Sequence, residues 1–332
     1  MKLLEQVKTV AARRRLADAT VNAYLSWITQ FMTFCAVRHQ AWRHPVNLGT
    51  ADVEAFLNDL VLHRRLSASA QNQALCALVF LYRHVLDGVI ANDHLGKFML
   101  ERSRRVPRLP TVLSREEVRR VLDALPKESK YRLMLELMYG TGIRVQELCT
   151  LRVRDIDLGR AQIIVRAGKG DKDRMVMLPR VLEEPLRAQL QRVETRWRED
   201  SNRGGGFAPV PEGLSHKRPR AGRELIMQYV FPSSVMRRDE SGRGVRWHTD
   251  GSALDRVVYD ASLRAELEKR VTCHTFRHSF ATHLLESGYD IRQVQTLLGH
   301  ANLKTTMIYT HVMNQPAIRV QSPLDQLAVK SA

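Results

Sequence analysis

Four side chains that can hold or attack a phosphate group stand close together late in the sequence. They are His274, Arg277, His300 and Tyr309. His274 and Arg277 are three residues apart, so on a helix they share one face. A guanidinium binds two phosphate oxygens at once, an imidazole can bond to them or move a proton, and a phenol can attack phosphorus. Such a set could break a phosphodiester without a metal.

The segment around these residues predicts three short helices. The first has an apolar stripe opposite its polar side, formed by Phe276, Phe280 and Leu284. Asp290 begins the second helix as its cap, and Gly299 ends it and leaves His300 at the rim. We expect the third helix to start at residues 305–306 and to carry Tyr309.

Two further cations precede this segment. Arg144 follows a glycine-containing turn and begins a helix, with Glu147 one turn later. An exposed ion pair at this spacing contributes little to stability, so the pair is either a surface contact or part of a site. Residues 161–165 and 175–178 predict a β-hairpin with Lys169 between two glycines at its tip. A lysine at a loop tip is usually only solvated.

These motifs resemble those of the tyrosine recombinase (phage integrase) family. Its pattern combines T-G-x-R-x-x-E-L, G-K-G-x-K-x-R, H-x-x-R, a later G-H and a tyrosine nine residues beyond that histidine, and every part occurs here. The chain is most similar to the integron integrases, through T-C-H-T-F-R-H-S-F-A-T-H-L-L-E-S-G-Y-D-I-R-Q-V-Q, T-T-M-I-Y-T-H-V and the S-P-L-D at residues 322–325.

The resemblance implies a catalytic set composed of Arg144, Lys169, His274, Arg277, His300 and Tyr309. In this interpretation Glu147 orients Arg144, the two arginines neutralise the phosphate oxygens, and Lys169, rather than Lys172, protonates the departing 5′ oxygen. The two histidines hydrogen-bond the phosphate and help manage the tyrosine proton. The 3′-phosphotyrosine bond has an energy similar to that of the bond broken, so no cofactor is required.

A metal site is the main alternative for the histidines of this segment. His274, His278 and His283 have spacings that metal ligands can have, but the sequence lacks the carboxylate of an H-E-x-x-H motif. We therefore expect no metal. His278 and His283 are interpreted as structural residues or as supports of the site, and His311 could be either structural or functional.

Composition limits the partners of the protein. A chain of 332 residues suits about two domains, and its formal charge of +17 is typical of proteins that bind nucleic acid. An anionic membrane surface is the rival partner, but no run of eighteen apolar residues occurs and the first fifteen residues are too charged for a signal peptide. We expect a cytoplasmic protein. The four cysteines are far apart, which argues against disulfides and zinc ribbons.

The periodicity predicts a mainly α protein with a small β-sheet. Residues 1–95 are helical throughout, and the resemblance implies a core-binding (SAM-like) domain that clamps DNA. Residues 96–112 form a linker interrupted by prolines, where Arg104 and Arg105 either follow a phosphate backbone or only keep the linker soluble. Residues 113–332 are the expected tyrosine recombinase catalytic domain. The family works on two duplexes as a homotetramer, and we expect a monomer when free.

Residues 200–248 are basic, rich in glycine and proline, and resemble an extra segment of the integron integrases. In that family the segment holds bases pushed out of a folded single-stranded cassette site. The expected DNA contacts are Lys217, Arg218, Arg220, Trp247 and His248. The chain departs from the family at Arg218, where tyrosine is usual, at Leu225 and Met227, where tryptophans are usual, and at Trp247, where histidine is usual.

Together these features predict an integron integrase that inserts and excises gene cassettes at attI and folded attC sites. The first alternative is a Xer-like or phage-type recombinase that acts on duplex sites only, and the extra segment argues against it. The second is a DNA-binding protein without catalysis, and the complete catalytic set argues against that.

Overall fold

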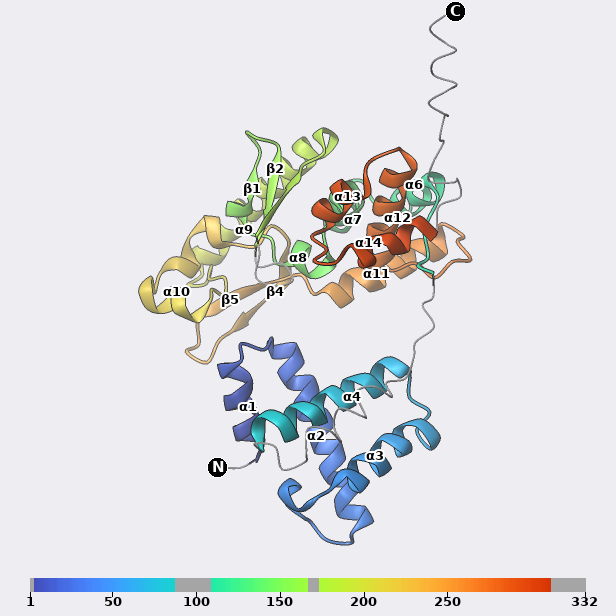
Figure 1. Ribbon diagram of the computed structural model, residues 1–332. Helices are drawn as coiled ribbons and strands as arrows, with labels where there is room; N and C mark the ends of the chain where they lie inside the picture. Colours follow the sequence, from blue (N-terminus) through green and yellow to red (C-terminus); the bar gives the residue numbers. More distant parts are fainter. Residues whose placement is uncertain (1–2, 87–108, 167–172, 312–332) are drawn as a thin grey trace, which may run out of the picture. The chain divides into compact units, whose positions relative to one another are not determined.

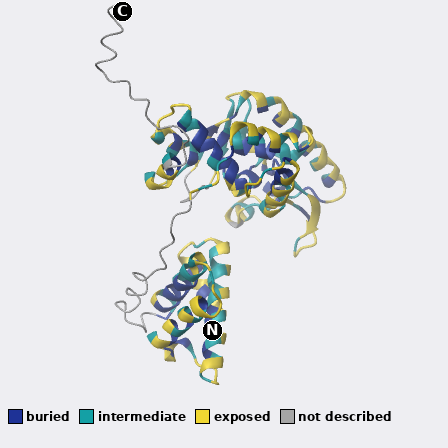
Figure 2. Ribbon diagram, turned by 90° about the vertical axis from the view of Figure 1, so that its right-hand side faces the viewer, coloured by how far each residue is buried: buried dark blue, intermediate teal, exposed yellow. Residues whose placement is uncertain are grey.

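The computed structural model describes residues 3–86, 109–166 and 173–311. The chain folds into two units, Met1–Arg108 and Leu109–Ala332 (Figure 1). Each unit has a buried interior covered by exposed residues (Figure 2). The predicted linker, with Arg104 and Arg105, lies outside the described residues.

The described part of the first unit is helical. Its elements are α1 (Leu3–Arg13), α2 (Asp18–Arg38), the turn η1 (Pro45–Asn47), α3 (Thr50–Leu62), α4 (Ala68–Phe80) and the π-helical turn η2 (Leu81–Val85). Apolar residues three and four apart put Ile28 and Phe31 of α2 in the core, where Phe31 contacts Phe56 edge to face. Ser67 begins α4 because its hydroxyl accepts the Ala70 N–H at 3.3 Å.

The second unit is mainly helical with two small antiparallel sheets. Its helices are α6 (Arg115–Asp123), α7 (Lys130–Thr141), α8 (Val145–Cys149), α9 (Glu183–Asn202), α10 (Glu212–Lys217), α11 (Gly251–Arg264), α12 (Cys273–Glu286), α13 (Ile291–Leu298) and α14 (Leu303–Met307). Short 3-10 turns are η3 (Val153–Asp155), η4 (Arg180–Leu182), η5 (Ala221–Arg223), η6 (Leu225–Met227) and η7 (Ile308–His311). This architecture confirms the predicted fold class.

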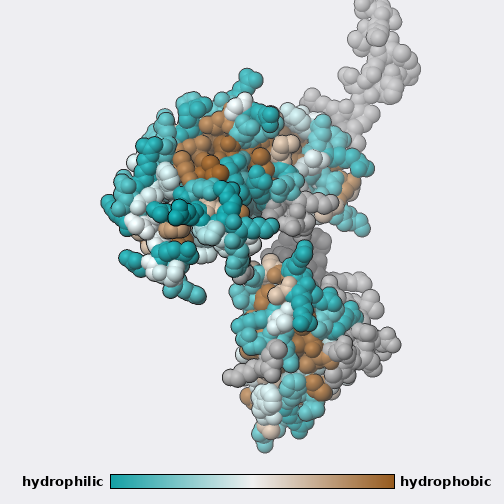
Figure 3. Space-filling view, turned by 90° about the vertical axis from the view of Figure 1, so that its left-hand side faces the viewer, coloured by the Kyte–Doolittle hydropathy of each residue, from teal (hydrophilic) through white to brown (hydrophobic). Residues whose placement is uncertain are grey.

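The first sheet has the strand order β1 (Ile156–Asp157), β2 (Gln162–Val165), β3 (Arg174–Met177). The predicted hairpin is β2 and β3, with Ile163 opposite Val176 and both buried. Alternate residues point outward, so Met175 and Met177 are exposed. Apolar area is also visible on the face of this unit shown in Figure 3.

The predicted insertion is a folded segment. It holds α10, η5, η6 and a second sheet of β4 (Pro232–Arg238) and β5 (Gly244–His248). The Asp200 carboxylate at the end of α9 accepts two hydrogen bonds from the Arg246 guanidinium, at 2.5 and 2.7 Å. Gly205 packs tightly: a Cβ there would lie 2.7 Å from Met236 Sδ.

Most residues of helix α12 are buried in the interior of the second unit. It packs against α7, and its Ser279 hydroxyl accepts the Leu113 N–H at 2.9 Å. Gly299 ends α13 with φ +61°, as predicted. The third helix, α14, does not start at residues 305–306. It begins at Leu303, because Asn302 caps it by accepting the Lys304 N–H at 2.9 Å.

Candidate active site

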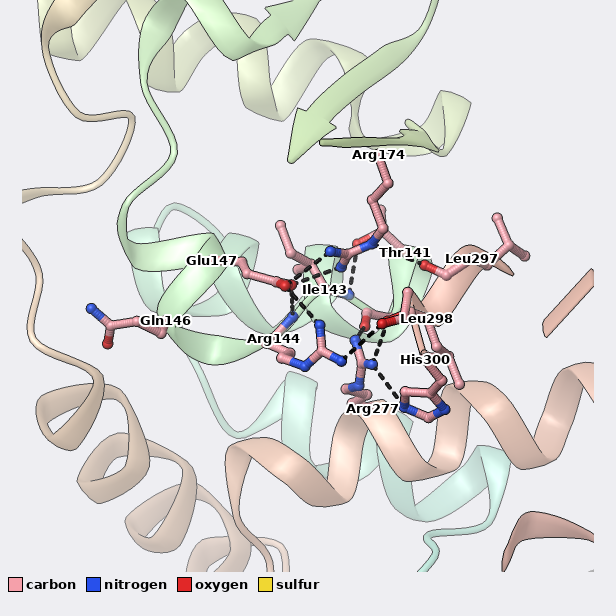
Figure 4. Close-up of polar contacts among 12 residues, drawn as sticks. Thr141, Ile143, Arg144, Gln146, Glu147, Arg174, Arg277, Leu297, Leu298 and His300 are labelled. Carbon is pink, nitrogen blue, oxygen red and sulfur yellow. Dashed lines mark hydrogen bonds and ion pairs between the residues drawn. The ribbon is translucent and has the colours of Figure 1, made fainter. Parts of the chain in front are cut away.

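Arg144 stands at the start of α8 and is held there by Glu147. The Arg144 backbone N–H and side-chain Nη1 donate to the two oxygens of Glu147, at 2.9 and 2.8 Å. Its Nη2 donates to the carbonyl oxygen of Gly299 at 3.3 Å. The guanidinium is thus fixed by a carboxylate on its own helix and by the end of α13, as Figure 4 shows.

Arg174 of β3 is a third member of this cluster, and sequence reasoning missed it. Its Nη1 and Nη2 donate to Glu147 at 2.9 and 2.7 Å, and its Nε donates to the carbonyl oxygen of Leu297 at 3.3 Å (Figure 4). Burial raises the pKa of Glu147, but the hydrogen bonds and charges of Arg174 and Arg144 outweigh it and lower the pKa to about 2. The only sequence signal was the last position of G-K-G-x-K-x-R.

Arg277 of α12 is almost fully buried beside Arg144. Its Nη1 donates to the carbonyl oxygen of Gly142, and its Nη2 donates to that of Leu298 at 2.6 Å. Gly142 has φ +65°, and a Cβ on it would lie 2.4 Å from the Phe280 ring, so glycine is required there. Burial, followed by the nearby charge of Arg144, lowers the pKa of Arg277 to about 10.

His300 follows the end of α13 and contacts Arg277. Its Nε2 lies 3.1 Å from Arg277 Nη2, and its Nδ1 lies 3.0 Å from the hydroxyl oxygen of Thr306. Burial, then the charges of Arg277 and Arg144, lower the pKa of His300 to about 4. The imidazole is therefore neutral at pH 7 and accepts a hydrogen bond from the guanidinium.

Tyr309 lies on the turn η7 and is nearly fully buried. Its ring stacks on the His300 ring, with centroids 6.3 Å apart, and its hydroxyl oxygen lies 3.1 Å from Nδ1 of His278. Burial raises the pKa of Tyr309, opposed by the charges of Arg277 and Arg144. His278, which we had interpreted as a structural or supporting residue, thus contacts the predicted nucleophile.

A cavity of about 320 Å³ lies among several of these side chains. Its lining includes Arg144, His274, Arg277, His278, His300 and Tyr309. His274 is exposed and lies at the first turn of α12, and its ring is 6.3 Å from that of His278. Two guanidinium groups, three imidazoles and a phenol around one cavity can hold a tetrahedral anion beside a nucleophile.

Comparisons with known proteins identify this arrangement. A model of the phage integrase family matches residues 111–315, and a model of the family's N-terminal SAM-like domain matches residues 3–91. The chain belongs to the phage integrase family of tyrosine recombinases. It is a site-specific DNA recombinase.

Relatives of this recombinase span most of its length. An integrase/recombinase from Escherichia coli is 42% identical over 328 residues, which cover 98% of this chain and 94% of the relative. The tyrosine recombinase XerA of Thermococcus kodakarensis is 41% identical over 212 residues, which cover 63% of this chain and 61% of the relative.

Solved structures of other recombinases share the fold. A XerH recombinase bound to its difH substrate has a TM-score of 0.59 and 21% identity, covering 100% of this chain and 84% of that one. A lambda integrase dimer bound to a core site has a TM-score of 0.58 and 18% identity, covering 96% of both chains.

One predicted catalytic residue of the recombinase lies outside the described residues. Lys169, like Lys172, falls within residues 167–172, which the structure does not describe. The other five predicted catalytic residues and Glu147 are described, and the structure brings all of them together.

The histidines of α12 do not converge on a metal. His283 turns away from the cavity, and its Nδ1 lies 2.9 Å from the Tyr139 hydroxyl oxygen. In the described part of the chain no group of three or more His, Cys, Asp or Glu side chains is placed to hold a metal ion. No helix among the described residues is long and apolar enough to cross a membrane.

The residues predicted to contact DNA in the insertion differ in how far they are exposed. Lys217, Arg218 and Arg220 are exposed around the end of α10, and Arg218 pairs with Glu224 at 2.6 Å. Trp247 of β5 is about half-exposed and lines a cavity of about 650 Å³ with Phe207. His248 is turned inward: its Nδ1 is 2.8 Å from the carbonyl oxygen of Thr249 and its ring packs edge to face on Tyr229.

Proposed function

We propose that Tyr309 attacks a DNA phosphodiester held between Arg144 and Arg277. The observation that carries this proposal is the single cavity in which the phenol, both guanidinium groups and His300 meet. Arg277 has a lowered pKa but stays charged at pH 7, and Arg144 keeps its position through Glu147. Both cations are therefore preorganised for the charge that develops on the non-bridging phosphate oxygens.

The product of this step is a 3′-phosphotyrosine bond, and Lys169 supplies the proton of the departing 5′ oxygen. His274 hydrogen-bonds the phosphate, and His300 accepts a hydrogen bond from Arg277 and so holds that guanidinium toward the phosphate. A second DNA end reverses the reaction and completes strand exchange. The energy of the broken phosphodiester bond is kept in the protein–DNA linkage, so the reaction needs no cofactor. The two arginines and Lys169 supply the positive charge that a metal would otherwise provide.

Substitution of Tyr309 by phenylalanine tests this assignment. Tyr309→Phe removes one oxygen from a packed ring, so DNA binding and the thermal midpoint should stay close to those of the parent while the covalent complex disappears from denaturing gels. Excess chelator should leave cleavage by the parent unchanged. An adduct formed by Tyr309→Phe, at the exposed Tyr289 for example, would disprove the assignment.

We further propose that this recombinase is an integron integrase that exchanges gene cassettes between attI duplexes and folded single-stranded attC sites. Support comes from the insertion, which is anchored to the catalytic unit by Asp200 and Arg246 and exposes Trp247. The rival is a Xer-like enzyme for duplex sites: a XerD from Lacticaseibacillus casei is 33% identical over 321 residues. The insertion favours the first proposal, because a duplex substrate offers no unpaired base to hold.

The cavity beside Trp247 has the side chains that an unpaired base needs. Its lining includes Phe207 and Arg243, and the Arg243 guanidinium lies 5.3 Å from the centre of the Phe207 ring. A base stacked between aromatic rings and guanidinium planes gains about 1–3 kcal/mol per contact. Trp247 supplies the indole in place of the aromatic residues that the family has at positions 218, 225 and 227.

A comparison of two substrates tests the integron proposal. The recombinase should bind a folded strand with extrahelical bases more tightly than the same sequence as plain duplex. Trp247→Ala should reduce that preference roughly tenfold and leave duplex binding nearly unchanged, since one stacking contact is lost. Trp42→Ala, which removes another exposed indole in the first unit, is the matched control. Equal losses on both substrates, or no preference in the parent, would favour the duplex-only enzyme.

We also propose how the remaining parts contribute. The first unit clamps DNA as a core-binding domain, and the linker at residues 96–112 follows the phosphate backbone through Arg104 and Arg105. The free protein is a cytoplasmic monomer, and four copies assemble on two DNA sites. Mass measurement of the free protein and of the synaptic complex tests the assembly. A tetramer without DNA would contradict it.

A further inference from the structure

His278 occupies a position that the proposed mechanism leaves without a role. It follows Arg277 on α12, lines the active-site cavity and is partly buried. Its Nδ1 lies 3.1 Å from the hydroxyl oxygen of Tyr309, and the two ring centroids are 5.5 Å apart. Among the described residues it is the side chain that hydrogen-bonds this hydroxyl.

The neighbouring histidine His300 cannot easily receive the phenol proton. A guanidinium only donates, so Nε2 of His300 accepts from Arg277 and the ring hydrogen is on Nδ1, which faces the Thr306 hydroxyl. A proton added at Nε2 would break the contact with Arg277. His274 is exposed at the mouth of the cavity, with its ring centroid 6.3 Å from that of His278.

His278 is neutral before DNA binds. Burial, then the charges of His274 and Arg277, lower its pKa to about 4. In the tautomer with its hydrogen on Nε2, Nδ1 carries a lone pair that accepts from the phenol, and this is the tautomer that proton transfer from Tyr309 requires. The cavity also presents Arg144, His300 and Tyr309 to this ring. A phosphate bound by the two arginines offsets their charge, which raises the proton affinity of His278 at the moment of attack.

We propose that His278 accepts the proton of Tyr309 as the phenol oxygen attacks phosphorus. This inference rests on the proposed role of Tyr309 as nucleophile. The bond from the Tyr309 oxygen to phosphorus forms, the bond from phosphorus to the 5′ oxygen breaks, and the phenol proton moves to Nδ1 of His278. The 5′ oxygen takes its own proton from Lys169. When the strands rejoin, His278 returns the proton to the departing phenol oxygen.

A substrate with sulfur in place of the bridging 5′ oxygen isolates this proton transfer. A thiolate leaves without a proton, so the rate of covalent-complex formation depends only on the nucleophile. The test variant is His278→Asn, because its amide oxygen can accept the Tyr309 hydrogen bond but cannot take the proton. On both substrates it should form the covalent complex about 100-fold more slowly at pH 7. Its rate should rise about tenfold per pH unit, as hydroxide replaces the missing base.

Three controls accompany the variant. His283→Asn changes the other histidine of α12 that bonds a tyrosine hydroxyl, outside the cavity, and should keep the rate of the parent. Lys169→Ala should form the covalent complex slowly on the oxygen substrate and at the rate of the parent on the sulfur substrate. Tyr309→Phe should form no adduct on either substrate. An adduct formed by this variant would show that Tyr309 is not the nucleophile, which is a separate failure from that of the His278 role.

Two results would overturn the role of His278. The first is that His278→Asn cleaves both substrates at the same rate and with the same pH profile as the parent. The second is that His278→Asn is slow on the oxygen substrate but as fast as the parent on the sulfur substrate, which would mean that His278 donates a proton to the leaving 5′ oxygen. If His278→Asn does not fold, His278→Ala is tested with added imidazoles. Rates that follow the pKa of the imidazole support proton transfer, and the absence of rescue contradicts it.

Discussion

Glu147 holds two cations of the active site at once. Each of its oxygens accepts from both Arg144 and Arg174, and its side chain is nearly buried. A carboxylate surrounded in this way neutralises one positive charge next to Arg277 and fixes the direction in which Arg144 points. The cluster thereby keeps three arginines close together without an opposing anion in the cavity.

Substitution of Glu147 should change the pH dependence of stability. A pKa lowered from the ordinary 4.5 to about 2 stabilises the folded state above pH 4.5, and this contribution is lost as pH falls toward 2. Glu147→Gln removes it, so the difference in the free energy of unfolding should be about 3 kcal/mol at pH 7 and should shrink between pH 4.5 and 2. Denaturant titrations across this range measure it.

Glu116→Gln is the matched control for this measurement. Glu116 also pairs with an arginine three residues on, Arg119, at 3.8 Å, but both side chains are exposed. Its substitution should change the free energy of unfolding by less than about 1 kcal/mol. A pH-independent difference between the parent and Glu147→Gln would refute the electrostatic explanation.

At the scale of helices and strands, the parts of the site that depend on local sequence signals could be predicted. The α12 pattern, the glycine at the end of α13 and the β2–β3 alternation are local signals, and the structure has all three. Arg174 could not be assigned, because its partner Glu147 is 27 residues earlier and only the fold brings them together. The contact of His278 with Tyr309 is likewise set by the position of η7 against α12. The start of α14 was misplaced because Asn302 is the stronger cap.

The turn after α7 should tolerate no side chain. Gly142→Ala combines a left-handed backbone with a clash against Phe280, whereas Gly288→Ala has the same backbone problem, at φ +85°, in open space. Gly288→Ala should cost about 1–2 kcal/mol of stability and keep cleavage. Gly142→Ala should cost about 1–3 kcal/mol more and lose most cleavage, because the Gly142 carbonyl holds Arg277. Thermal unfolding and adduct formation report both effects, and equal losses in the two variants would contradict the clash.

At the scale of the whole molecule, the net positive charge indicates what the protein binds and does not determine its fold. The excess of 17 positive charges opposes compaction unless an anion offsets it. Several arginines are already engaged inside the second unit, among them Arg246 with Asp200, and these serve the fold. Other cations, such as Arg220, are exposed, and we expect these to contact the phosphate backbone of the DNA.

Binding should therefore weaken steeply as salt rises. Each phosphate contact releases about one counterion, and a protein with 6–10 such contacts loses roughly 10³–10⁵ in affinity between 50 and 200 mM salt. We expect a loss in this range for a duplex site. Arg220→Gln should reduce the slope of log affinity against log salt by about 1. Arg198→Gln, which removes a charge paired with Glu194 at 2.6 Å, should leave the slope unchanged. A shallow slope in the parent would mean that base stacking and shape, rather than phosphate contacts, provide most of the binding free energy.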